Sequence, residues 1–233
     1  MKQDAQLALA VQLPDDETFT SFNGEGNQHV IAILSEFVEG KLDANSFYLF
    51  GLQGAGKSHL IHAACNLADE NGLSSLCLSM TDLKDMSVDV LDGLEQIDVI
   101  CVDDVQSISS SLQWQKAIFD LYNRVNEAGK RIIITGDAVI NDLGLSLPDL
   151  KSRLSWGLIE QIKPLSDEEK VAAVKRRAAQ RGLTVQDEAI RYLLNHYSRE
   201  MAKLIDYLDT LDKLSIREQR KITIPFIKEA LER

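Results

Sequence analysis

Residues 51–58, Gly-Leu-Gln-Gly-Ala-Gly-Lys-Ser, restrict the fold of this chain more than any other stretch. They match the pattern G-x-x-x-x-G-K-[S/T], in which backbone N–H groups wrap around the phosphates of a nucleotide. Residues 46–50 before the loop read as a strand, and residues 59–68 after it carry apolar side chains at helical spacing. The pattern therefore predicts a strand, a phosphate-binding loop and a helix whose N-terminus faces the anion.

Two positions near this loop are candidate ligands for Mg²⁺. Lys57 is expected to reach the β- and γ-phosphates, and the Ser58 hydroxyl to bind the metal. Val99-Ile-Cys-Val-Asp103 is an apolar strand that ends in a carboxylate, which a hard cation prefers. Asp104 follows, where many ATPases use the longer glutamate to position the attacking water. The expected nucleotide contacts are Gly51, Gln53, Gly54, Ala55, Gly56, Lys57, Ser58 and His59.

A further strand, residues 131–135, is followed closely by polar groups at Thr135 and Asp137. Polar groups at the tip of a strand beside the loop strand can sense a γ-phosphate or orient water. Ordinary turn chemistry at Thr-Gly-Asp explains them equally well, so both readings stay open.

The order of patterns along the chain predicts two domains. Strand and helix patterns alternate from about residue 46 to 163, which is typical of a parallel sheet covered on both faces. After Pro164 the patterns are helical only, with helix starts expected at Ser166, Asp187, Ser198 and Thr223. We expect an α/β nucleotide-binding core over residues 18–164 and a small all-helical lid over 165–233. The strands are expected at 46–50, 74–79, 98–102, 131–135 and 158–162.

Composition excludes several classes of protein. The net charge of −11 over 233 residues argues against strong direct DNA binding, which depends on neutralising phosphates. Cys65, Cys77 and Cys101 lie in apolar segments and read as buried thiols of a reducing compartment. No stretch approaches the ~20 apolar residues of a membrane span. We expect a cytoplasmic protein without membrane contact.

The phosphate loop, the Asp103-Asp104 strand, the polar-tipped strand and the helical lid together resemble the AAA+ ATPases of the bacterial initiator DnaA group. Residues 51–66 and Val102-Asp-Asp-Val-Gln106 are especially similar, and the resemblance runs from about Thr18 to the C-terminus. It implies an AAA+ core with a five-stranded parallel sheet, and ADP or ATP with Mg²⁺ as ligand, ADP being favoured. Phe19 and Phe22 lie in a stretch similar to the adenine-lining segment of that group, although core packing explains them as well.

The resemblance also gives two arginines a role. Arg153, in Ser-Arg-Leu-Ser-Trp-Gly157, matches the arginine finger that AAA+ proteins insert into a neighbour's nucleotide site. Arg199 matches the lid arginine that contacts the bound phosphates. The sequence ends after the lid, so the resemblance implies a stand-alone regulator without the initiator's DNA-binding helix-turn-helix domain.

The N-terminal segment, residues 1–17, contains Gln6-Leu-Ala-Leu-Ala-Val11. It resembles the peptide that docks on the bacterial sliding clamp, in which Gln6 fixes the register and Leu7, Leu9 and Val11 contact the groove. Ala10 and Val11 depart from the most common residues, and a plain N-terminal strand is the alternative reading.

These expectations converge on a negative regulator of replication initiation. It would bind the loaded clamp and stimulate ATP hydrolysis by the DnaA initiator through Arg153, with weak ATPase activity of its own. Two alternatives stay open: an autonomous ATPase acting as a homo-oligomer, and a DNA-tethering initiation factor.

Overall fold

The structure is a computed structural model that describes residues 17–22 and 24–231. Its centre is one parallel sheet with the strand order β2-β3-β4-β1-β5, which confirms the predicted five-stranded parallel sheet. Each strand lies within one residue of its predicted bounds: β1 Ser46–Phe50, β2 Ser75–Ser79, β3 Val99–Asp103, β4 Arg131–Gly136 and β5 Leu158–Gln161. The strands run in the same direction, so all their carboxyl ends, including that of β1, lie at one edge of the sheet.

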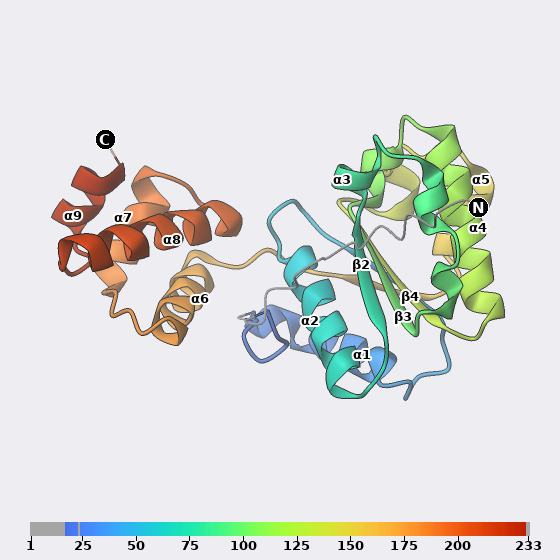
Figure 1. Ribbon diagram of the computed structural model, residues 1–233, viewed down its shortest axis with the longest axis horizontal. Coiled ribbons are helices and arrows are strands. Elements are labelled where there is room, and N and C mark those ends of the chain that lie inside the picture. The colour runs from blue at the N-terminus through green and yellow to red at the C-terminus, as the bar shows by residue number, and fades with distance from the viewer. Residues whose placement is uncertain (1–16, 23, 232–233) are drawn as a thin grey trace, which may run out of the picture.

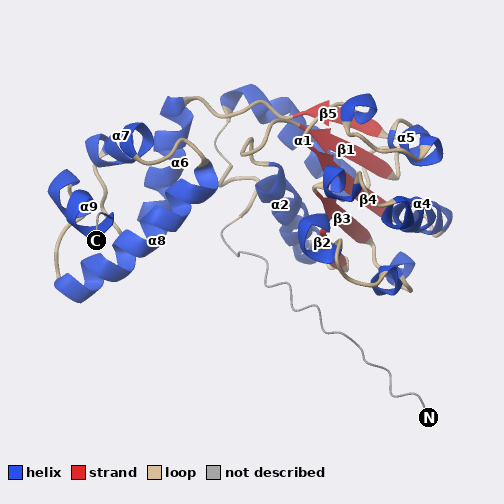
Figure 2. Cartoon of the chain, turned by 90° about the horizontal axis from the view of Figure 1, so that it is seen from above, coloured by secondary structure: helices blue, strands red, loops and turns tan. Residues whose placement is uncertain are grey.

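Helices cover both faces of this sheet (Figures 1 and 2). The core helices are α1 Gln28–Val38, α2 Lys57–Glu70, α3 Met80–Leu83, α4 Leu112–Glu127 and α5 Pro148–Leu154. Short 3₁₀ turns lie at Glu25–Asn27, Val88–Leu91, Leu94–Gln96, Val105–Ile108 and Ile140–Asp142. Figure 2 shows α1 and α2 on one side of the sheet and α4 and α5 on the other.

Strand alternation explains the two apolar layers. Successive side chains of a strand point to opposite faces, so Phe47 and Leu49 pack with α1 and α2 while Tyr48 packs with α4 and α5. All three are almost fully buried, as expected for strands of a sheet covered on both sides. The three cysteines are buried free thiols, as predicted. Burial raises the pKa of Cys77 and therefore keeps it as a thiol.

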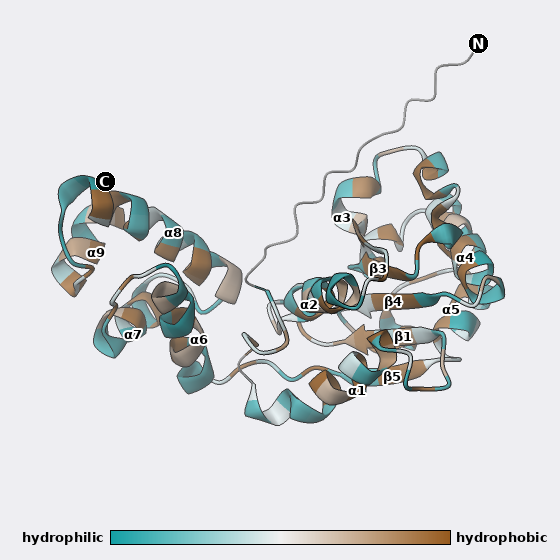
Figure 3. Cartoon of the chain, turned by 60° about the horizontal axis from the view of Figure 1, so that its bottom comes forward, coloured by the Kyte–Doolittle hydropathy of each residue, from teal (hydrophilic) through white to brown (hydrophobic). Residues whose placement is uncertain are grey.

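The lid is a separate group of four helices at one end of the molecule, joined to β5 by residues 162–166 (Figure 1). These helices are α6 Asp167–Gln180, α7 Asp187–His196, α8 Met201–Glu218 and α9 Ile224–Leu231. Apolar residues fall in bands along them (Figure 3) and enclose a core of their own around Val174, Leu193, Leu204 and Phe226. The predicted boundary after residue 164 falls in the connecting segment.

The start of α6 follows local capping chemistry, whereas α7 and α8 begin without a side-chain cap. Ser166 and Glu169 form the predicted capping box of α6, in which each side chain accepts from the other residue's backbone N–H. The sequence predicts that Ser198 caps the third lid helix, and this prediction is wrong. Its hydroxyl instead accepts the N–H of Glu200, two residues on, and α8 begins only at Met201. Ser198 thus forms a local turn, which competes with helix capping.

Among the described residues, no helix is both long and apolar enough to cross a membrane.

Candidate nucleotide-binding site

The phosphate-binding loop joins the carboxyl end of β1 to the N-terminus of α2. Gly54 and Gly56 adopt positive φ angles of +75° and +103°, which glycine reaches without steric cost. The Lys57 ammonium donates to the carbonyl oxygens of Gly51 at 2.9 Å and Leu52 at 3.3 Å, so the loop curls around it. The first N–H groups of α2 have no intrahelical partners and point toward the loop, which makes this end of the helix suited to an anion.

A cavity of about 400 Å³ opens between this loop and the lid, within the range of small-molecule sites. Every predicted loop contact from Gln53 to His59 lines it, as do Phe22 and Asp104. Gly51 is buried and is not among the lining residues, and Phe19 packs against the apolar layer under α2. The remaining lining residues are Glu17, Ser21, Leu165, Ala173, Arg176, Arg177, Gln180, Met201, Ala202, Ile205 and Asp206.

The sequence interpretation missed the contribution of α6 to this cavity. Arg176 and Arg177 both line it, and Arg176 also donates to the Thr20 carbonyl at 2.8 Å, which ties the lid to the core. Two adjacent arginines near the C-terminal end of this lid helix were the available signal in the sequence. Together with Lys57 they bring positive charge to a cavity suited to phosphates.

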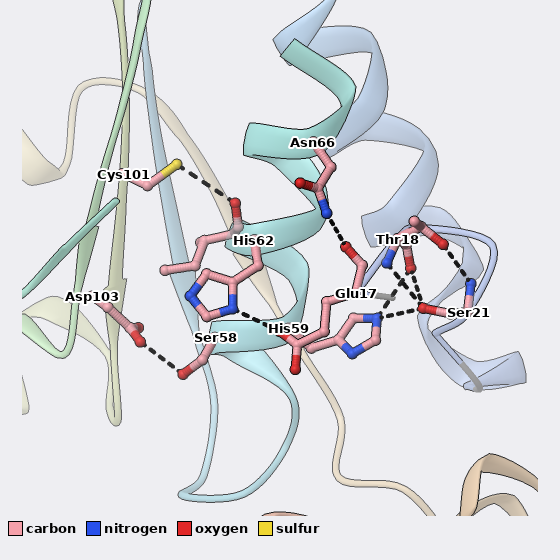
Figure 4. A network of polar contacts seen from close by, with 10 residues as sticks. Glu17, Thr18, Ser21, Ser58, His59, His62, Asn66, Cys101 and Asp103 are labelled. Carbon is pink, nitrogen blue, oxygen red and sulfur yellow. Dashed lines mark hydrogen bonds and ion pairs between the residues drawn. The ribbon is translucent and has the colours of Figure 1, made fainter. Parts of the chain in front are cut away.

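The candidate metal ligands lie together at the ends of β3 and α2. Ser58 Oγ donates to Asp103 Oδ2 at 2.7 Å (Figure 4). No group of three or more His, Cys, Asp or Glu side chains suited to a metal occurs in the described part of the chain. Mg²⁺ at nucleotide sites needs no such cage, because it keeps waters and phosphate oxygens among its ligands. One hydroxyl and one carboxylate that already meet therefore fit Mg²⁺.

Thr135 connects the tips of β3 and β4. Its hydroxyl donates to the other oxygen of Asp103 and accepts the backbone N–H of Asp104 at 2.9 Å. Thr135 is fully buried, so its hydroxyl depends on these partners. Asp137, the other polar group predicted at this tip, is exposed and lies outside the cavity lining.

Asp104 takes a left-handed backbone conformation at φ 58° and ψ 53°, which aspartate tolerates better than most residues. Its carboxylate lines the cavity and accepts from the Gln106 side chain at 2.8 Å. This is the position of the predicted water-orienting residue. The structure places it beside the phosphate loop, and its role stays a prediction.

Polar contacts fasten residues 17–21 to α2 (Figure 4). His62 Nδ1 lies 2.6 Å from Glu17 Oε2, and the Asn66 amide donates to the Glu17 carbonyl at 2.8 Å. His59 Nε2 lies 3.0 Å from the Thr18 carbonyl, to which it donates. The segment that follows residues 1–16 is therefore held against the helix that presents the phosphate loop.

Burial and charge act in opposite directions on these groups. Burial alone would lower the pKa of His62, but the hydrogen bond and charge of Glu17 raise it overall. Burial alone would raise the pKa of Glu17, but His62 and the nearby positive charges lower it overall. Burial lowers the pKa of His59, and the Thr18 carbonyl offsets this only in part. The raised pKa of His62 and the lowered pKa of Glu17 therefore favour the charged forms of both groups, whereas the lowered pKa of His59 favours its neutral form.

Arg153 lies far from this cavity. It is in the last turn of α5, and the chain turns back into β5 at Gly157, against the backbone of Ser46 at the start of β1. The phosphate loop follows the opposite end of β1, five residues along, or roughly 16 Å away at 3.3 Å per residue. Arg153 therefore lies near the amino edge of the sheet, and its own nucleotide site lies at the carboxyl edge.

Arg199 lies outside the cavity lining, two residues before Met201, which lines it. Its guanidinium is 3.4 Å from the Asp167 carboxylate, and the two side chains are 65% and 40% exposed. The predicted contact of Arg199 with phosphates stays a prediction. The predicted clamp contacts Gln6, Leu7, Leu9 and Val11 lie outside the described residues.

Comparison with known families supplies the decisive match. Residues 13–161 match the family model of the bacterial DnaA ATPase domain. The chain belongs to the bacterial DnaA ATPase family. Residues 167–231 match a second model, the lid domain of Hda. This pair of matches agrees with Hda, a DnaA-related AAA+ protein, and places the chain in an AAA+ nucleotide-binding family of DNA replication proteins.

Solved structures agree with this DnaA-type assignment. Domain III of Thermotoga maritima DnaA superposes with a TM-score of 0.80 at 19% identity, over 94% of this chain and 97% of that one. AMPPCP-bound DnaA from Aquifex aeolicus superposes with a TM-score of 0.68 at 25% identity, over 88% of this chain and 66% of that one. The Thermotoga maritima RuvB branch migration motor superposes with a TM-score of 0.67 at 16% identity, over 94% of this chain and 72% of that one. At 16–19% identity, the RuvB and Thermotoga DnaA likenesses are evidence of the AAA+ fold alone.

Proposed function

We propose that this chain is an Hda-type negative regulator of replication initiation in the bacterial cytoplasm. It binds the sliding clamp loaded on DNA through Gln6–Val11 and stimulates ATP hydrolysis by the DnaA initiator through Arg153. The matches to the DnaA ATPase and Hda lid families support the choice of partner.

The observation that carries this proposal is the position of Arg153. A guanidinium at the amino edge of the sheet is separated from its own nucleotide site by the length of β1, so it is suited to a neighbour's site. Within residues 17–22 and 24–231 no carboxylate forms an ion pair with Arg153. Its N–H donors are therefore not held by any carboxylate of the described residues.

The chemistry asked of Arg153 is electrostatic. When water attacks the γ-phosphorus of ATP and the bond to the β-phosphate oxygen breaks, negative charge spreads over the transferred oxygens. A planar guanidinium placed there stabilises that charge, an effect worth roughly 10³–10⁵ in rate in related phosphoryl-transfer systems. The initiator supplies ATP and its own metal site, and this chain supplies the arginine.

The cavity between core and lid has a different role in this proposal. It holds ADP, with Lys57, Arg176 and Arg177 near the phosphates and Ser58 and Asp103 as ligands of Mg²⁺. Bound Mg²⁺ neutralises phosphate charge there. Arg199 would leave Asp167 to reach the nucleotide, and the bound ADP would stabilise the arrangement of core and lid.

The test measures ATP hydrolysis by purified DnaA initiator with clamp-loaded DNA and this protein. Stimulation should be lost with Arg153→Ala and reduced with Gln6→Ala. Arg217→Ala, which removes an exposed arginine from α8, is the matched control and should stimulate like the wild type. If Arg153→Ala stimulates hydrolysis as much as the wild type does, Arg153 is not the arginine finger.

The same assay addresses the alternative of an autonomous ATPase. That alternative predicts turnover by this protein alone, independent of clamp and initiator and abolished by Lys57→Ala. The proposed regulator predicts little turnover in isolation, because Arg153 lies across the sheet from its own nucleotide.

A further inference from the structure

Two aromatic side chains flank the guanidinium of Arg153. Its central carbon lies 4.2 Å from the ring centroid of Trp156 and 5.9 Å from that of Phe119 on α4. Both distances are within cation–π range, and the indole ring is the best acceptor among the aromatic side chains. Trp156 is the closer partner and is 67% exposed, so burial in the core does not explain its position.

The backbone fixes Trp156 even though its ring is exposed. Its N–H donates to the Arg153 carbonyl at 3.1 Å, and this closes the turn after α5. Ser155 Oγ donates to the Lys151 carbonyl at 2.8 Å in the same turn. At Gly157 an added Cβ would clash with the Ser46 carbonyl oxygen, so only glycine allows this close approach to β1. The turn therefore places the indole ring over the guanidinium.

Stacking and phosphate binding use different parts of an arginine. The face of the planar guanidinium contacts the ring, whereas its N–H donors point outward in the plane. An ion pair with a carboxylate would occupy those donors, but a stacked ring leaves them available. Stacking can thus hold the side chain in place without competing with phosphate.

We propose that Trp156 is a positioning residue for Arg153. By stacking on the guanidinium, it holds the side chain extended and ordered before the partner's ATP arrives, so that less side-chain freedom is lost on insertion. This proposal rests on the proposed function, because it assigns Trp156 a role only if Arg153 acts in trans.

The experiment compares Trp156→Ala, Trp156→Leu and Trp156→Tyr in the initiator hydrolysis assay, titrating this protein to saturation. We expect the maximal stimulated rate to fall roughly two- to five-fold with Ala and Leu, the range of an exposed cation–π contact. Tyr keeps an aromatic face and should retain most of the rate. The half-saturating concentration should stay unchanged in all three, because ordering the finger alters the catalytic step and not docking.

Contrary results are distinct. A raised half-saturating concentration with an unchanged maximal rate would make Trp156 a docking contact and overturn the positioning role. So would a Leu variant as active as the Tyr variant. If Arg153→Ala abolishes stimulation while Trp156→Ala and Trp156→Leu match the wild type, only the positioning role fails. If Arg153→Ala itself stimulates normally, the proposed function fails.

Two controls complete the test. Ile216→Ala removes an equally exposed apolar side chain, 70% exposed on α8, and should stimulate normally. Trp156→Ala added to Arg153→Ala should have no further effect on the rate.

Fluorescence of the free protein tests the stacking directly. The emission of Trp156 is obtained as the difference between the wild type and Trp156→Tyr. This emission should change when Arg153 is replaced by alanine. An unchanged emission would show that the two side chains do not stack in solution.

Discussion

The two glycines that flank α2 allow a sharp test of how the phosphate loop is built. Gly56 precedes the helix at φ +103°, and Gly72 follows it at φ +71°. A Cβ added at Gly56 would lie 2.6 Å from Cε2 of Phe22, whereas one added at Gly72 would meet nothing within 4 Å. Both variants therefore force alanine into a positive φ, further from the ordinary left-handed region at position 56, and only Gly56→Ala adds a steric contact.

The expected costs follow from these contacts. Left-handed backbone costs a non-glycine residue about 1–2 kcal/mol, and the less flexible unfolded chain returns about 0.4–1 kcal/mol. Gly72→Ala should therefore lower the free energy of unfolding by about 1 kcal/mol. Gly56→Ala must also displace the Phe22 ring, which packs edge-on against the His59 ring with the two ring centroids 5.4 Å apart. Overpacking of this kind adds about 1–3 kcal/mol, for a total of about 2–4 kcal/mol.

Urea unfolding without nucleotide measures both costs, and calorimetric titration with ADP and Mg²⁺ measures the consequence for binding. Gly72→Ala should bind ADP like the wild type, because it changes only the far end of α2. Gly56→Ala should lose most of its affinity, because the loop that presents backbone N–H groups is displaced. Equal destabilisation by the two variants, or equal ADP affinity, would refute the role assigned to the Gly56–Phe22 contact.

Three further predictions test other parts of the site. The pKa of His62 is raised above 6.5, so its contribution to stability is complete below pH 6.5 and is lost as the pH rises through the pKa of the folded state. The pKa of Glu17 is lowered below 4.5, so its contribution to stability is lost only as the pH falls through its pKa in the folded state. His62→Ala should therefore cost about 1–3 kcal/mol in urea unfolding near pH 5.5 and less near pH 9, and an equal cost at both would contradict the ion pair. Thr135→Val should lower the free energy of unfolding by about 1–3 kcal/mol, because it leaves a buried N–H and carboxylate without the hydroxyl; a melting temperature equal to wild type would exclude this. Arg199→Ala should weaken ADP binding, and Asp167→Asn should strengthen it slightly by releasing the guanidinium; opposite shifts in titration calorimetry would remove Arg199 from the site.

Elements whose signals are local could be predicted from the amino-acid sequence. The phosphate loop, the five strands and the α6 capping box each depend on neighbouring residues, because backbone conformation, side-chain alternation and helix capping act within a few positions. Even there, a local competitor decided one case. Serine is a common helix-capping residue, but the Ser198 hydroxyl accepts the N–H of Glu200, which lies before the helix. The residue type alone does not indicate this.

Contacts between residues that are distant in the sequence depend on how the whole chain folds. Glu17 reaches His62 across 45 positions, and Thr135 joins Asp103 across 32. These pairs arise because parallel strands bring their carboxyl ends to one edge, and because the segment before α1 lies along α2.

Long-range packing also sets the surroundings of Arg153 and of the arginines that line the cavity. The sequence identified Arg153 by resemblance, but only the folded chain separates it from its own phosphate loop by the length of β1 and places Trp156 over it. The lid likewise turns Arg176 and Arg177 toward the cavity because α6 packs its apolar face on α7 and α8. Local sequence thus determines what each segment forms, and long-range packing determines what it faces.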